Sequence, residues 1–156
     1  MTDPSSRTFW HVDAFTVERY SGNAAAVVLG GDGLSAEQMQ RIAREMNLSE
    51  TVFVCRSDHP DADYRARIFT LRSEIPFAGH PTVAAAYGVV ASGRLPPDPG
   101  LLRQECGIGL VPIEVGEEAG APVFTMTQGR PEYRSAGVDP ALAAEMLGCR
   151  ADQQSR

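Results

Sequence analysis

The stretch that decides the fold is Glu74-Ile75-Pro76-Phe77-Ala78-Gly79-His80-Pro81-Thr82, which leads from a loop into a run of small apolar residues. A proline with a polar residue before it is typical of a helix start, because the first helical position needs no backbone N–H donor. The sequence therefore predicts a helix from Thr82 to Val90 with Pro81 at its first position. Gly93 and the proline-rich segment 96–100 end it.

Short strand patterns lie on both sides of this helix. Ser35, followed three residues later by Gln38, predicts a second helix with a capping box that ends near Asn47. Many short strands with two longer helices indicate an α+β fold rather than a parallel βαβ array. Runs of β-branched, aromatic and alternating apolar residues predict strands at 8–16, 24–29, 51–55, 64–70, 101–105, 110–115 and 123–128.

The composition of the chain changes after Gln128. Residues 129–137 have the character of a linker, and Asp139-Pro140 predicts a short helix through Leu147. We therefore expect one domain over residues 1–128, followed at 129–156 by a linker and the start of a truncated second domain.

Charge and composition exclude several classes of function. The chain has 156 residues, 43% of them hydrophobic, and a net charge of -6, which is unsuited to a nucleic-acid partner. No apolar run reaches the roughly 20 residues of a membrane span, and a cytoplasmic protein is expected. All 14 basic residues are arginine, which excludes a lysine Schiff base and a Walker A lysine within this chain. We expect neither a cofactor nor a metal.

The first candidate for chemistry is Glu50 in Asn47-Leu48-Ser49-Glu50-Thr51. An acid at a helix-to-strand corner, followed by three apolar residues, is expected to be partly buried and suited to proton exchange. An exposed loop glutamate is the alternative that the pattern favours when it is taken alone.

The second candidate is the predicted helix start Gly79-His80-Pro81-Thr82. Its unpaired N–H groups and positive dipole end suit a carboxylate, and His80 adds a donor or a proton carrier. A purely structural helix start is equally compatible with the sequence. Asp13 and Asn23 are further candidates for the polar wall of a pocket, although such residues more often serve turns and caps.

Several motifs in register carry a family resemblance. They include His11-Val12-Asp13-Ala14-Phe15-Thr16, Gly22-Asn23-Ala24-Ala25-Ala26-Val27-Val28-Leu29, Leu48-Ser49-Glu50-Thr51 and the stretch quoted at the outset. From about Phe9 to Gln128 the chain resembles the PhzF-like proteins of phenazine biosynthesis, whose fold is that of diaminopimelate epimerase. The resemblance implies one half of that fold, with a mixed, mostly antiparallel and strongly curved sheet around a central helix.

The resemblance also implies functional roles. Glu50 corresponds to the proton-shuttling glutamate, and Gly79 and His80 to the motif that holds the substrate carboxylate. Members are cofactor-independent isomerases, epimerase-like enzymes or carbon–carbon hydrolases. Ala78 stands where true epimerases have a catalytic cysteine, so a two-thiol mechanism is not expected, and Cys55 and Cys106 lie at other positions.

Length is the main departure from the family pattern. The family has two similar halves with the active site between them, and its last strand returns to the first half. Three explanations are open: a fragment that is inactive alone, a partner that supplies the second half, or a second copy in a homodimer, which is the one we favour. A non-catalytic binding or regulatory module is the alternative. In either case we expect Glu50 to face the helix start near His80 across a gap wide enough for a small carboxylated metabolite.

Overall fold

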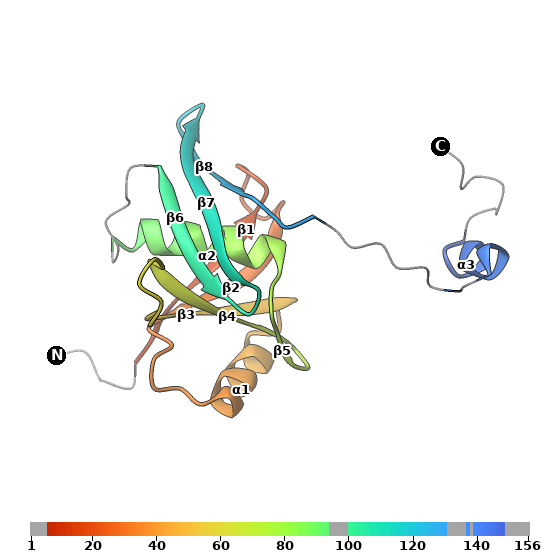
Figure 1. The fold of residues 1–156 in the computed structure, drawn as a ribbon, viewed down its shortest axis with the longest axis horizontal. Coiled ribbons are helices and arrows are strands. Elements are labelled where there is room, and N and C mark those ends of the chain that lie inside the picture. Colours follow the sequence, from red (N-terminus) through yellow and green to blue (C-terminus); the bar gives the residue numbers. More distant parts are fainter. Residues whose placement is uncertain (1–5, 94–99, 131–136, 138, 149–156) are drawn as a thin grey trace.

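The computed structural model describes residues 6–93, 100–130, 137 and 139–148, and its main body is a curled sheet with one helix on each side (Figure 1). The sheet order is β1-β2-β3-β4-β6-β7-β8, with the short β5 paired to β4. The strands are β1 (Thr8–Ala14), β2 (Asn23–Leu29), β3 (Glu50–Cys55), β4 (Tyr64–Thr70), β5 (Glu74–Ile75), β6 (Leu101–Cys106), β7 (Gly109–Glu118) and β8 (Ala121–Met126). The helices are α1 (Ala36–Met46), α2 (Gly79–Ala91) and α3 (Pro140–Met146).

Most neighbouring strands are antiparallel. Only the β2–β3 and β4–β6 pairs are parallel, and α1 and α2 respectively lie in the connections that those parallel pairs require. This mixed, mostly antiparallel and curled arrangement confirms the predicted fold class.

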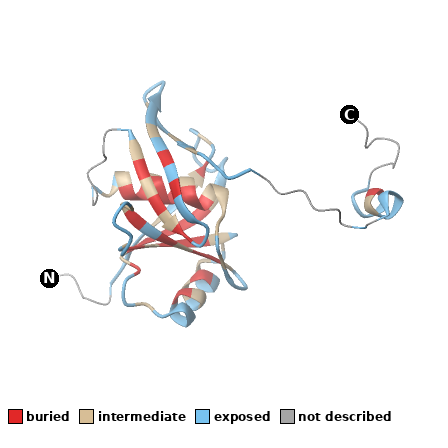
Figure 2. Cartoon of the chain, in the orientation of Figure 1, coloured by how far each residue is buried: buried red, intermediate tan, exposed pale blue. Residues whose placement is uncertain are grey.

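Helix α2 lies inside the curl of the sheet and contacts β1, β2, β3, β4 and β8 (Figure 1). Its small side chains, Ala84, Ala85 and Ala86, are fully buried and allow the strands to approach closely. At Gly88 a Cβ atom would lie only 2.9 Å from Val27 Cγ1, so glycine is needed for this approach. Figure 2 shows the buried residues concentrated along α2 and the strands that surround it.

Helix α1 packs on β3 and β4, where a second apolar cluster forms. Met39 and Ala43 are buried against Phe53 and Phe69, whose rings meet edge to face. The predicted capping box is confirmed, because Ser35 Oγ accepts from the Gln38 N–H and Gln38 Oε1 accepts from the Ser35 N–H.

The main difference from the predicted elements lies at the start of α2. The helix begins at Gly79 rather than Thr82, so Pro81 occupies the third helical position instead of the first. Proline is still compatible with this position, because the first four N–H groups of a helix have no intrahelical acceptor. Strand β8 likewise ends at Met126, two residues before the predicted end.

The short C-terminal helix α3 forms as predicted, with Asp139 Oδ1 accepting from the Ala141 N–H. Most of the linker expected at 129–137, and residues 149–156, lie outside the described residues. The division of the chain at residue 128 therefore stays a prediction. Among the described helices, none is both long and apolar enough to cross a membrane.

Candidate active site

The fold brings Glu50 and His80 together. Glu50 is the first residue of β3 and is paired with Ala25 on β2 and with Thr70 on β4, while His80 is the second residue of α2. His80 Nε2 lies 3.2 Å from Glu50 Oε2, and the two side chains are only 11% and 18% exposed. The acid is therefore mostly withdrawn from solvent, which contradicts the exposed loop glutamate that the local pattern alone favours.

The expected gap between these two groups is absent, because the carboxylate and the imidazole are in direct contact. Glu50 Oε2 is a buried oxygen that receives no hydrogen bond within the described part of the chain, so the approach of His80 Nε2 is close but poorly aligned. A metabolite would have to bind beside this pair rather than between its members. An unsatisfied carboxylate oxygen next to an imidazole is an arrangement that can take up and release a proton.

Ser49 and Asn23 lie at the same end of the sheet. Ser49 Oγ is 3.5 Å from His80 Nε2 and 3.4 Å from the carbonyl oxygen of Ala24. Asn23 is the exposed first residue of β2, adjacent in the chain to Ala24. Ser49 therefore borders the Glu50–His80 pair, whereas Asn23 lies two residues before Ala25, the β2 residue that pairs with Glu50.

Asp13 holds the loop between β1 and β2. Its Oδ2 accepts from the N–H of Tyr20 at 3.0 Å. Tyr20 and Phe15 have φ angles of 68° and 64°, which is uncommon for aromatic residues, and both side chains are exposed. Asp13 thus supports an exposed, locally strained loop. It also lines an open cavity between β1 and β8.

Thr82 and Pro81 are buried, and the Thr82 hydroxyl is engaged inside the fold. Thr82 Oγ1 donates to the carbonyl oxygen of Ala78 at 2.8 Å and accepts from Gln104 Nε2 at 3.0 Å. Tyr64 donates its hydroxyl to Gln104 Oε1 at 3.1 Å. The side chain of Thr82 therefore belongs to a buried chain of hydrogen bonds that fixes the residue before α2, not to the open side of the helix start.

Tyr64 and Gln104 are positioning residues that the local sequence pattern did not single out. Burial raises the pKa of Tyr64 well above its ordinary value, which keeps its hydroxyl a donor. The sequence of β6 contains a sign of this network, because every second residue of the strand, Leu102, Gln104 and Cys106, is buried. A glutamine at an inward position of an otherwise apolar face indicates a buried hydrogen-bond network.

The start of α2 has no side-chain cap. Its N-cap residue is Ala78, which offers no acceptor, and its first turn contains no acidic residue. The free N–H groups and the positive end of the helix dipole therefore remain available to an anion next to His80.

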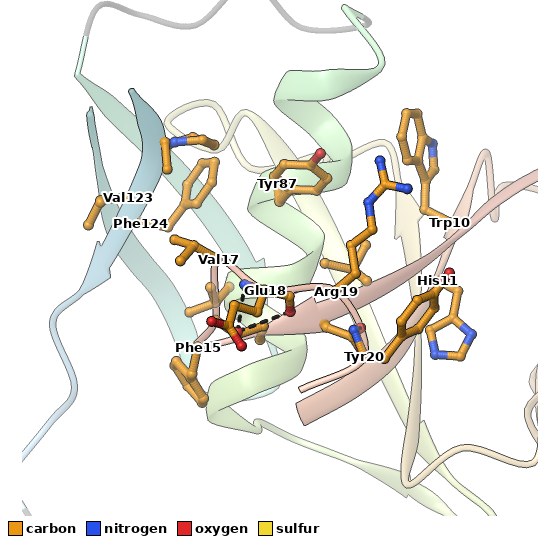
Figure 3. A pocket seen from close by; sticks show the side chains of 17 residues that line it. Trp10, His11, Phe15, Val17, Glu18, Arg19, Tyr20, Tyr87, Val123 and Phe124 are labelled. Carbon is orange, nitrogen blue, oxygen red and sulfur yellow. Dashed lines mark hydrogen bonds between the residues drawn. The ribbon is translucent and has the colours of Figure 1, made fainter. Parts of the chain in front are cut away.

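A large open cavity lies elsewhere in the described part of the chain. It is an open trough of about 1000 Å³ between the outer edges of β1 and β8, and neither Glu50 nor His80 lines it (Figure 3). Its floor includes Tyr87 of α2, which meets Trp10 of β1 and Phe124 of β8 edge to face. Both bordering strands are ends of the sheet and have no outer strand partner in the described part of the chain.

Metal-ligating side chains do not gather within the described ranges, where no group of three or more His, Cys, Asp or Glu is placed to hold an ion. Cys55 and Cys106 are buried free thiols. Burial, together with the charge of Asp32, raises the pKa of Cys55 to about 11.

This curled sheet around a small-residue helix, with an acid and a histidine at its open end, is one half of the diaminopimelate-epimerase-like fold. The family model described as phenazine biosynthesis-like protein (PhzC-PhzF) matches residues 12–156, and the chain belongs to this family.

Similar proteins support the assignment and show its extent. The chain is 45% identical over 117 residues to the trans-2,3-dihydro-3-hydroxyanthranilate isomerase of Pseudomonas aeruginosa, covering 75% of this chain and 40% of that protein. It is 42% identical over 150 residues to an uncharacterized isomerase of Mesorhizobium japonicum, covering 96% of this chain and 45% of that protein. The crystal structure of a PhzF-family protein from Bacillus anthracis aligns with a TM-score of 0.80 at 34% identity, covering 94% of this chain and 48% of that one. The chain therefore spans less than half the length of these relatives.

Proposed function

We propose that this chain provides the proton-transferring half of a PhzF-like isomerase that acts, without a cofactor, on a small carboxylated metabolite in a biosynthetic pathway. Glu50 carries the proton, and the start of α2 at Gly79 and His80 binds the substrate carboxylate. The observation that carries this proposal is the buried, unsatisfied Glu50 Oε2 located 3.2 Å from His80 Nε2. A carboxylated substrate is also what the isomerase from Pseudomonas aeruginosa takes, by its name.

The proposal includes completion of the site by a second polypeptide, with a homodimer as the favoured form. The trough between β1 and β8 supports this, because it exposes an aromatic floor together with two strand edges that have no partner among the residues the structure describes. Unpaired edges and exposed apolar surface both favour association with another chain. Sedimentation equilibrium of the full chain tests the proposal, and a strict monomer that shows no proton exchange would argue against it.

The proton-transfer role is tested with Glu50→Gln in deuterated water. The glutamine has the shape of the acid but cannot accept a proton, so deuterium incorporation into trans-2,3-dihydro-3-hydroxyanthranilate should fall at least about a hundredfold. Substrate binding, measured by calorimetry, should change by less than about threefold. Glu45→Gln, an exposed glutamate of α1, is the matched control and should keep full exchange.

A non-catalytic binding module is the second candidate, and the coverage of 40% and 45% of the two relatives favours it. In that case the wild-type chain binds the acid without exchanging any carbon-bound hydrogen. Equal exchange by wild type and Glu50→Gln would instead remove Glu50 from its proposed role while leaving the family assignment intact.

A further inference from the structure

The end of β8 covers the start of α2. A Cβ atom at Gly79 would lie 3.2 Å from Met126 Cε and 3.7 Å from Gln128 Nε2, so these two side chains lie directly over the Gly79 backbone. Gln128 follows β8 by two residues and is exposed. The absence of a side chain at Gly79 therefore places the Gln128 amide next to the helix start that carries His80.

The Gln128 amide has no hydrogen-bond partner elsewhere in the described part of the chain that would hold it away from this position. Its Nε2 offers two donors and carries no charge. The amide therefore adds donors for a ligand without adding a charge.

A carboxylate has two oxygens that each accept more than one hydrogen bond, and a helix start supplies donors from one side only. The second oxygen needs donors from another direction. Gln128 approaches from β8, and the N–H groups come from α2, so the two elements together present donors to both oxygens.

We propose that Gln128 is a substrate-binding residue that donates through Nε2 to the carboxylate bound at the start of α2. This inference rests on the proposed function and deepens it, because a donor at Gln128 would select ligands with a free, planar carboxylate. An ester or a primary amide of the same acid has one carbonyl oxygen and no negative charge, so it gains less from Gln128 than the carboxylate does.

The experiment follows the backbone amide signals of Gly79 and His80 by NMR during titration of the full chain with benzoate, an unreactive carboxylate probe. Gln128→Leu should weaken benzoate binding about tenfold, as expected for loss of one hydrogen bond to a charged group. Gln128→Glu keeps the shape of the side chain but replaces the donor with a negative charge, so it should weaken benzoate binding more than Gln128→Leu does. Binding of benzamide should change less than twofold in both variants.

Thr125→Val is the control, because Thr125 is an exposed residue near the end of β8 and its substitution should leave benzoate binding unchanged. Thermal unfolding of each variant verifies that the fold is intact. Equal benzoate affinity in wild type, Gln128→Leu and Gln128→Glu would overturn the role of Gln128 and leave the proposed function standing. If benzoate shifts neither amide signal in the wild type, the carboxylate site itself is wrong.

Discussion

Two threonines with the same exposure but different partners provide a matched test of the buried network. Thr82 and Thr51 are both 0% exposed. Thr82 Oγ1 bonds to Gln104 and to the carbonyl of Ala78, whereas Thr51 Oγ1 is buried without a partner among the described residues. Replacing each by valine exchanges one hydroxyl for one methyl group in a closed environment.

The two substitutions should change stability in opposite directions. Thr82→Val leaves Gln104 Nε2 as a buried donor without an acceptor, which costs about 1–3 kcal/mol. We expect a net loss of about 2 kcal/mol after a partial offset from the added methyl group. Thr51→Val removes an unsatisfied hydroxyl from a strand position that favours valine, and should gain about 1 kcal/mol.

Urea unfolding followed by Trp10 fluorescence measures both effects, because Trp10 is the single tryptophan of the chain. With a slope of about 2 kcal/mol per molar, Thr82→Val should lower the midpoint by about 1 M and Thr51→Val should raise it by about half of that. The amide signals of Gly79 and His80 should also shift in Thr82→Val, since Ala78 loses its hydroxyl donor. Equal midpoints for the two variants would refute the assignment of the hydrogen bonds.

Two further predictions concern packing and titration. Gly88→Ala should lower the free energy of unfolding by about 1 kcal/mol, because the clash of the new methyl group with Val27 Cγ1 outweighs the gain in helix propensity. Urea unfolding measures this loss, which should disappear when Val27 is also replaced by alanine. The raised pKa of Cys55, about 11 in the fold against 9.0 for the free group, predicts that native Cys55 resists iodoacetamide at pH 8 in peptide mapping. It also predicts that stability is retained below pH 9 and falls as the pH rises toward 11, because the Cys55 thiol ionises in that window only in the unfolded chain. Cys55→Ala should remove the part of this slope between pH 9 and 10, whereas the buried Tyr64, whose pKa is also raised, contributes above pH 10 with or without Cys55.

The elements that could be predicted from sequence are those fixed by local chemistry. The capping box of α1 needs only Ser35 and Gln38, and the stop at Asn47 needs only a residue that tolerates its φ of 53°. The start of α2 was misplaced because it depends on a distant contact. Thr82 bonds back to Ala78 and is itself held by Gln104, 22 residues further along the chain, so the helix begins before its proline.

The candidate site shows the same division between local and distant causes. Glu50 and the Gly79-His80 pair could be singled out by motif, but their contact depends on the register of β2 with β3 and on the depth of α2 within the sheet. Gln128 had no local signal, because its relevance comes from the absence of a side chain at Gly79. Residues that act through long-range geometry are the ones a single sequence does not reveal.

The contact between Glu50 and His80 also restricts how the acid can act. Oε2 is buried against the imidazole, and no substrate atom fits within the 3.2 Å that separates it from Nε2. In the proposed proton transfer, the oxygen of Glu50 left to meet a substrate is therefore Oε1, while Oε2 stays against the imidazole. His80 takes part twice in this arrangement, since its backbone N–H belongs to the helix start while its ring Nε2 lies 3.2 Å from Glu50 Oε2. His80→Gln keeps the backbone and a side-chain donor but cannot exchange a proton, so carboxylate binding should be retained while proton exchange slows.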